Sequence, residues 1–162
     1  MSLPAAKAAG INSDGQIAES GTDLFIGSWQ IGSMMIGAPL LTVHLTFATQ
    51  SGSVAGIGQI TQPVNPPLEI LSKIDGDFTY LTVMPDTSHI LVTATGYPVI
   101  HWPPHGGIGP VLLPNLYLRM VLAADWQSGT ATFRYAGAGG TWHVVESATV
   151  EAIKPIETTG KP

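Results

Sequence analysis

Hydrophobic and polar side chains alternate along most of this chain with the two-residue period of β-strands. The clearest segment is 40–50, where the polar face is mostly threonine together with His44. Its apolar face consists of Leu41, Val43, Leu45 and Phe47. The segment 116–124 repeats the pattern with Leu116, Leu118, Met120 and Leu122. Because successive side chains of a strand point to opposite faces, each segment is predicted to turn one apolar face to a core.

Eight or nine segments have this strand character, and none has convincing helical periodicity. Besides the two above they are an opening strand around Trp29 and the ranges 54–61, 68–74, 78–84, 89–96, 130–136 and 141–153. Short turns rich in Gly, Ser, Asp and Pro join most of them. The sequence therefore predicts a single all-β domain with antiparallel strands in a mostly meander-like order. It is either a β-sandwich or an up-and-down β-barrel, and periodicity does not distinguish the two.

Glycines inside the strand pattern mark local irregularities. Gly56 and Gly58 indicate a bend, a bulge or a close approach of two backbones. Asp75-Gly76-Asp77 has the character of a turn or a strand kink between 68–74 and 78–84.

The two ends of the chain differ from its middle. Residues 1–22 are rich in Ala, Gly and Ser and are expected to form a flexible arm, and residues 154–162 a flexible tail. The β domain is therefore predicted to span residues 23–153.

Charge is scarce, since Asp, Glu, Lys and Arg make up 10% of the chain and the net charge is −5. No charged side chain apart from histidine lies between Asp23 and Glu69 or between Asp86 and Arg119. An acidic chain with scattered cations argues against nucleic-acid binding. Strand edges without lysine or other charge are prone to pair with another chain. We therefore expect a homo-oligomer.

The groups that usually carry catalysis are nearly missing. There is no cysteine, no Gly-x-Ser-x-Gly nucleophile motif, and no phosphate-binding glycine loop before a helix. Asp75 and Asp77 are expected to be solvated, and Glu146 and Glu151 to pair with Arg134 across a hairpin. We expect no enzyme activity, no catalytic residues, no cofactor and no metal site.

The N-terminal residues show no secretory signal, and no apolar run is long enough for a transmembrane segment. A cytoplasmic location is the default expectation, with release by another route left open.

The stretch 97–115 is long for a loop in a compact β domain and carries several rings. Its candidate contact residues for a sugar, a peptide or a neighbouring subunit are Tyr97, His101, Trp102 and His105. The alternative is that the loop tucks over one end of the domain as a lid. Pro103 and Pro104 stiffen the segment between the two histidines, so a shared metal is not expected there. Trp126, in a turn, and Trp29 complete the predicted contact residues.

Several turn and strand-end motifs occur together in this chain. They are Asn65-Pro66-Pro67, Gly96-Tyr97-Pro98, Leu113-Pro114-Asn115 and Asp125-Trp126-Gln127-Ser128-Gly129. Together they resemble a small bacterial family catalogued only as a domain of unknown function. The resemblance implies a shared fold over most of the chain and implies no catalytic residues.

Gly27-Ser28-Trp29 is similar to the first strand of avidin-like and lipocalin barrels. That similarity implies a tryptophan packed at one end of a barrel and, as one alternative function, a cavity for a small apolar ligand behind Trp29. A further alternative is a membrane-active or toxin-like component, since the hairpin 40–61 is uncharged and alternating. The predicted function is a non-enzymatic binding or structural module that associates with itself.

Overall fold

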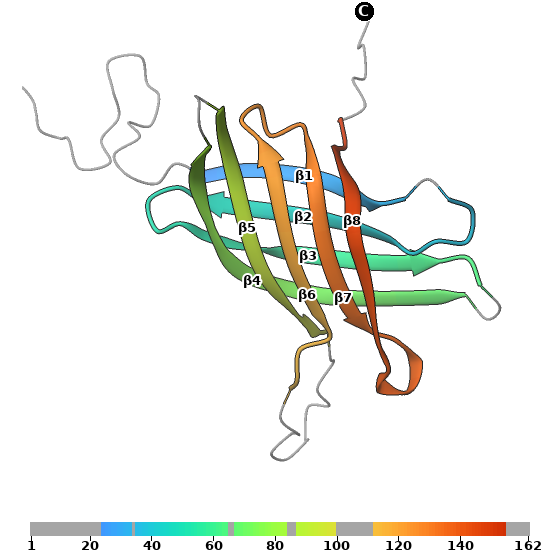
Figure 1. Cartoon of the computed structure of the whole chain (residues 1–162). Helices are drawn as coiled ribbons and strands as arrows, with labels where there is room; N and C mark the ends of the chain where they lie inside the picture. Colours follow the sequence, from blue (N-terminus) through green and yellow to red (C-terminus); the bar gives the residue numbers. More distant parts are fainter. Residues whose placement is uncertain (1–23, 34, 65–66, 84–86, 100–111, 155–162) are drawn as a thin grey trace, which may run out of the picture.

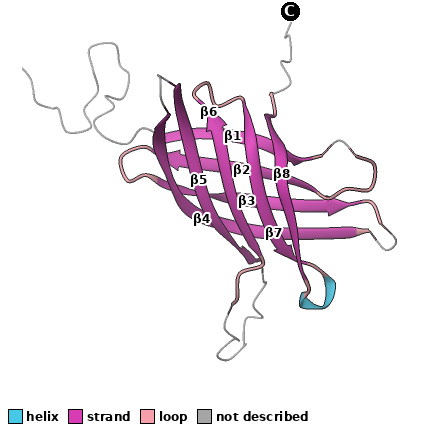
Figure 2. Cartoon of the chain, in the orientation of Figure 1, coloured by secondary structure: helices cyan, strands magenta, loops and turns pink. Residues whose placement is uncertain are grey.

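The computed structural model describes residues 24–33, 35–64, 67–83, 87–99 and 112–154. Within these ranges the chain forms antiparallel strands and a single 3-10 turn, η1 (Ala138–Gly140), and no helix there is long and apolar enough to cross a membrane (Figure 2). The strands are β1 (Leu24–Gly32), β2 (Leu40–Ala48), β3 (Ser53–Gln62), β4 (Leu68–Val83), β5 (Thr87–Pro98), β6 (Leu116–Ala123), β7 (Ser128–Ala136) and β8 (Trp142–Ala152). The all-β prediction is confirmed.

The strands close into a barrel in the order of the sequence, β1 to β8. Each strand pairs with the next, and β1 closes the barrel by pairing with β8. Figure 1 shows β5–β8 crossing in front of β1–β4. Of the two predicted architectures, the chain therefore adopts the up-and-down barrel.

The barrel interior is filled by the apolar faces that the alternation predicted. The inward side chains of β2 and β6 are buried to 2% exposure or less. The largest fully buried side chains come from almost every strand, among them Trp29, Phe47, Phe133, Ile31, Ile60, Ile74, Ile90, Met120 and Leu122. An eight-stranded barrel is just wide enough for side chains to fill. The interior is therefore a packed core.

The structure corrects one prediction, since 68–74 and 78–84 are not separate strands but parts of the continuous strand β4. Asp75 and Asp77 are exposed and the Gly76 between them is half-buried, so the alternation runs through this segment without a turn. Gly76 pairs with β3 on one side and β5 on the other. A Cβ atom there would lie 2.6 Å from Ala94 Cα and overlap the Thr93 carbonyl oxygen. Glycine is required because the backbones of β4 and β5 approach closely at this position.

Asn115, directly before β6, forms hydrogen bonds to residues of three other strands. Its N–H donates to the Gly96 carbonyl oxygen at 2.8 Å, and its own carbonyl accepts from the Ala136 N–H at 2.9 Å. Its side-chain oxygen Oδ1 accepts a hydrogen bond from Ser72 Oγ at 2.7 Å, and Ser72 is fully buried in β4. The Leu-Pro-Asn motif thus fixes the entry of the chain into β6.

We expect Ser72→Ala to lower the free energy of unfolding by about 1–2 kcal/mol, because the partly buried Asn115 side-chain oxygen loses its donor. Urea unfolding followed by circular dichroism measures this cost. Ser53→Ala removes a hydroxyl from an exposed position of β3 and is the matched control, with an expected change below about 0.5 kcal/mol. Equal costs for the two variants would contradict a structural role for the Ser72–Asn115 bond.

Candidate functional site

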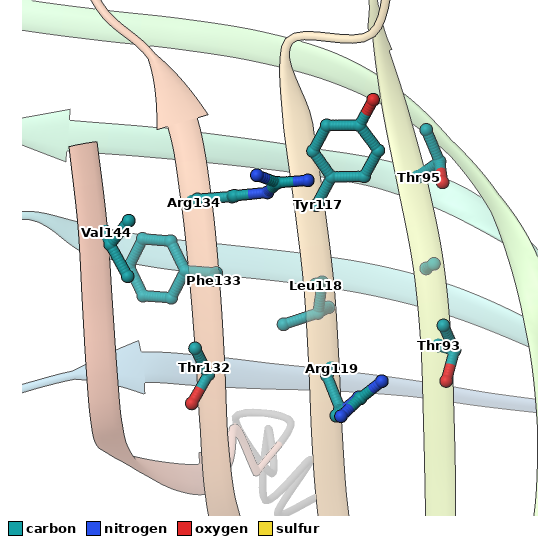
Figure 3. A pocket seen from close by; sticks show the side chains of 10 residues that line it. Thr93, Thr95, Tyr117, Leu118, Arg119, Thr132, Phe133, Arg134 and Val144 are labelled. Carbon is teal, nitrogen blue, oxygen red and sulfur yellow. The ribbon is translucent and has the colours of Figure 1, made fainter. Parts of the chain in front are cut away.

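Both arginines of the chain lie on the outer wall of the barrel formed by β5–β8 (Figure 3). Arg119 in β6 alternates with the buried Leu118 and Met120, and Arg134 in β7 alternates with the buried Phe133 and Tyr135. Because successive side chains of a strand point to opposite faces and these apolar neighbours face the core, both guanidinium groups point outward. Two neighbouring strands thus bring together cations that lie far apart in the sequence.

Two aromatic rings lie beside Arg134. The β6–β7 register places Tyr117 opposite it, and the Arg134 Cζ atom lies 4.4 Å from the centre of the Tyr117 ring. The Trp142 ring is 5.6 Å from the same Cζ atom and 5.4 Å from the Tyr117 ring. A guanidinium over a ring face is attracted by the ring's quadrupole, which leaves its N–H edge open to a partner.

The wall is hollowed here, with a volume of about 300 Å³. Threonine hydroxyls border the hollow, and Figure 3 shows Thr93 and Thr95 on β5 and Thr132 on β7 around the arginines. We call this surface the arginine–aromatic patch, and it consists of Thr93, Thr95, Tyr117, Arg119, Thr132, Arg134, Trp142 and Val144. Its volume is at the lower end of the range for ligand sites, about 300–1,000 Å³.

Neither arginine has an ion-pair partner among the residues that the structure describes. The predicted pairing of Arg134 with Glu146 or Glu151 is wrong, because the register places Val144 opposite Arg134 and Ser128 opposite Glu151. The patch therefore carries two positive charges that form no ion pair in the described part of the chain.

Acidic side chains also border the patch, since Glu146 is exposed in β8 two residues from Val144. Asp75 stands opposite Thr95 and Asp77 opposite Thr93, both on the outer face of β4. They are two strands away from the β6 arginine, which corresponds to about 10 Å. This arrangement limits the negative charge that a ligand of the patch can carry.

The buried tyrosine next to Arg134 in β7 is neutral. Tyr135 faces the interior from β7, and its ring stacks on that of His143 with 5.2 Å between the centres. Burial raises the pKa of the Tyr135 phenol above its ordinary value. The phenol is therefore protonated at neutral pH and adds no charge next to Arg134 in the chain.

The sequence-predicted contact residues do not gather at this patch. Tyr97 is half-buried near the end of β5, opposite Lys73. His101, Trp102 and His105 lie outside the described residues. Within the described ranges no three His, Asp or Glu side chains lie together as metal ligands would.

Trp29 and Trp126 meet at the barrel end that carries the β6–β7 turn. Tyr97 lies at the other end of the barrel, where β5 ends and β6 begins. Trp29 Nε1 donates to the Trp126 carbonyl oxygen at 2.8 Å. The Trp126 ring is 5.0 Å from that of Phe47, and its backbone has a φ of 65°, unusual for a bulky residue. The remaining rings of this end are Phe25, Phe78 and Tyr80. The geometry gives these two tryptophans a packing role, as expected for a tryptophan that closes one end of a barrel.

The sequence reasoning missed Tyr117, Arg119 and Trp142 as site residues and assigned Arg134 to an ion pair. The usable signal was the hairpin itself. If the hairpin 116–136 is centred on the turn at 124–127, its two strands pair so that Tyr117 lies opposite Arg134 and Arg119 lies opposite Thr132.

Fold and site together define a closed, side-chain-filled β-barrel whose distinctive chemistry lies on its outer wall. A family described as a domain of unknown function (DUF1842) matches residues 22–142. The chain belongs to this family, as its turn motifs predicted. None of the curated proteins compared with the chain matches it. The family description assigns no activity, so the site must indicate the function.

Proposed function

We propose that this protein is a non-enzymatic binding module that associates with copies of itself and binds carboxylate groups of a partner at the arginine–aromatic patch. The observation that carries the proposal is the pair Arg119 and Arg134. These residues share one hollowed wall, have no ion pair in the described part of the chain, and belong to a protein of net charge −5. Arginines without an ion pair beside partly exposed rings are typical of a recognition surface.

The spacing of the two arginines suggests what they bind. Arg119 stands opposite Thr132, two residues from Arg134 on the same face, so the arginines are diagonal neighbours. Such neighbours lie about 7–8 Å apart. Alternate side chains of an extended peptide are about 6.8 Å apart. Each guanidinium is able to bind one carboxylate with two parallel hydrogen bonds. The expected ligand is therefore an extended peptide with acidic residues at alternate positions.

The surroundings of the patch support a ligand of low total charge. Asp75 and Asp77 repel a polyanion that extends over β4. Thr95 and Thr132 offer neutral hydrogen-bonding groups beside the arginines. A peptide of alternating acidic and neutral residues fits these conditions better than a nucleic acid.

The packed core favours this outer surface over an internal ligand cavity. The space behind Trp29 is occupied by other core side chains, including Phe47, whose ring lies 5.6 Å from that of Trp29. Self-association is supported by β1–β3, whose described residues include no Asp, Glu, Lys or Arg. A cytoplasmic location and a bacterial source are part of the proposal and rest on the sequence alone.

We expect a short peptide of alternating glutamate and threonine to bind the protein. Arg119→Ala and Arg134→Ala are each expected to weaken this binding about tenfold or more, because a hydrogen-bonded carboxylate–guanidinium pair contributes about 1.5–3 kcal/mol. Calorimetric titration measures the dissociation constants. Lys73→Ala removes a cation from the outer face of β4, outside the patch, and is expected to leave binding unchanged.

The same peptide with glutamine in place of glutamate tests the role of charge. We expect it to bind at least tenfold more weakly. Equal binding of both peptides, or full binding by the double variant Arg119→Ala, Arg134→Ala with an unchanged circular dichroism spectrum, would refute the patch as the carboxylate site.

A further inference from the structure

Two carboxylates on β4 have the spacing of the ligand that the arginine–aromatic patch is expected to bind. Asp75 and Asp77 flank Gly76, and both are exposed on the outer face of the strand. Neither forms a side-chain hydrogen bond or an ion pair with another residue that the structure describes. Alternate side chains of a strand lie about 6.8 Å apart. The chain itself therefore contains an extended segment with acidic residues at alternate positions.

The strand register sets these carboxylates and the arginines on either side of β5. Asp77 of β4 pairs with Thr93 of β5, and Thr93 pairs with Arg119 of β6 (Figure 3). All three side chains are exposed on the outer wall. Because neighbouring strands are about 4.8 Å apart, Asp77 and Arg119 lie at equal distances from β5 and at the same level along it.

The neighbouring row of the wall repeats this arrangement. Asp75 pairs with Thr95, and Thr95 pairs with Tyr117 of β6. The Arg134 Cζ atom lies 4.4 Å from the centre of the Tyr117 ring. The second arginine thus holds its charge close to the position on β6 that mirrors Asp75 across β5.

We propose that the carboxylate partner of the patch is the segment Asp75-Gly76-Asp77 of a second copy of this chain. The two copies pack wall against wall about a two-fold axis that runs along β5, so that β4 of each copy faces β6 of the other. Asp77 then faces Arg119 of the second copy, and Asp75 faces Arg134. The interface is self-complementary, because each copy supplies two carboxylates and two guanidinium groups to the other. This inference rests on the proposed function and names the partner of its site.

Charge complementarity favours this occupant and this axis. Copies of net charge −5 repel each other in most orientations, and both arginines of the chain lie on this wall. A two-fold axis across the strands would set β4 against β4 and place the aspartates opposite each other. The axis along β5 instead sets each aspartate against an arginine. Lys73, two residues before Asp75, faces the second copy near Asn115, which is uncharged.

The other side chains of the wall fit this packing. β3 of one copy faces β7 of the other, so the small side chains of Ser53 and Ala55 face Thr132 and Arg134. Leu91 is half-buried on the outer face of β5 and meets Leu91 of the second copy on the axis. The wall of a barrel is convex, so the gap between two walls widens away from the axis. The long arginine side chains reach across that gap.

Charge reversal tests the pairing. Asp77→Arg sets two arginines against each other at both symmetry-related contacts, and Arg119→Asp sets two aspartates against each other there. The dimer dissociation constant measured by analytical ultracentrifugation is expected to rise at least about tenfold in each variant. Glu69→Arg is the matched control, because it changes the net charge as Asp77→Arg does but lies on β4 beyond the last residue that pairs with β5. We expect it to leave the dimer unchanged.

The double variant Asp77→Arg, Arg119→Asp is expected to recover the dimer, since opposite charges then face each other again. An equimolar mixture of the two single variants is expected to do the same. Recovery also shows that the single variants are folded. A double variant that stays as weak as the single ones, or equal weakening by Glu69→Arg, would overturn the interface.

The position of the axis gives a readout that does not depend on charge. Thr93 of one copy faces Thr93 of the other, across packed sheets about 10 Å apart. The chain has no cysteine, so a short bis-maleimide linker is expected to join Thr93→Cys into a covalent dimer on a denaturing gel. Thr46→Cys places the thiol on the outer face of β2, three strands from β5, and is expected to remain a single chain. Equal cross-linking of both variants would rule out an axis along β5.

A competition experiment separates this inference from the proposed function. The alternating glutamate–threonine peptide is expected to dissociate the dimer, because it competes for the same two arginines. A dimer that persists at saturating peptide, while peptide binding still requires Arg119 and Arg134, would refute the interface and leave the patch as a carboxylate site. A wild-type protein that is monomeric at high concentration would refute self-association and this interface together.

Discussion

Trp29→Ala is expected to lower the free energy of unfolding by about 3–5 kcal/mol. The Trp29 side chain is 1% exposed and packs edge-to-face on Phe47. Its Nε1 hydrogen bond also holds the carbonyl of Trp126, whose positive φ is costly for a bulky residue. The substitution therefore creates a cavity and releases a strained turn at the same time. Urea unfolding followed by far-UV circular dichroism measures the loss.

Trp142→Ala is the matched control for this prediction. The same indole is removed from the outer wall, where its contact with Arg134 is exposed to solvent, and the expected cost is about 1 kcal/mol or less. Trp29→Phe keeps a ring in the core and removes the N–H donor, so an intermediate loss is expected. Equal costs for Trp29→Ala and Trp142→Ala would contradict the placement of Trp29 in the core.

Gly76→Ala is expected to cost about 1–3 kcal/mol or more, although it adds a single methyl group. The new Cβ would lie 2.8 Å from Ala94 Cβ and would overlap the backbone of Thr93. Backbone atoms in a paired strand cannot move aside as the end of a flexible side chain does. The pairing of β4 with β5 must therefore shift, and the thermal midpoint is expected to fall by several degrees.

Gly137→Ala tests whether the cost at Gly76 is specific. Gly137 has a φ of −83°, which alanine adopts without strain. A Cβ there would lie 3.1 Å from the His143 ring and 3.7 Å from the Thr141 carbonyl oxygen. We expect the free energy of unfolding to change by no more than about 1 kcal/mol, in either direction. Alanine lowers the conformational entropy of the unfolded chain, and this gain offsets the cost of a small rearrangement of the His143 ring. A large loss at Gly137 and none at Gly76 would contradict the close approach of β4 and β5.

The strands and their inner faces were predictable because alternation is local information. Leu41 to Phe47 in β2 and Leu116 to Leu122 in β6 are buried as the pattern indicated. The predicted break at Gly76 was wrong, because Asp-Gly-Asp has the composition of a turn, and only the partner strands show that the glycine admits a neighbouring backbone. Closure into a barrel was beyond the sequence pattern, because it depends on Ile31 meeting Val150 from the far end of the chain.

The candidate site was harder to predict than the fold. Arg119 and Arg134 are single charges in different strands, and neither belongs to a motif. Their proximity follows from the β6–β7 register, and the β7–β8 register places Val144 and not a glutamate opposite Arg134. The rings that drew attention in the sequence, Trp29 and Trp126, are largely engaged in packing. Aromatic residues in a short sequence motif do not reveal whether a core or a surface holds them.

The order of pairing has a consequence for how the chain folds. Each pair from β1–β2 to β7–β8 joins consecutive strands, so loop-closure entropy is small for these hairpins. The seam between Trp29 and Ala152 brings together residues from opposite ends of the domain through four residue pairs. The seven hairpins are therefore expected to form first, as a curled meander, and β1 is expected to pair with β8 afterwards. Substitutions along Trp29–Gly32 that disturb the seam should chiefly accelerate unfolding, while those within the hairpins should slow folding.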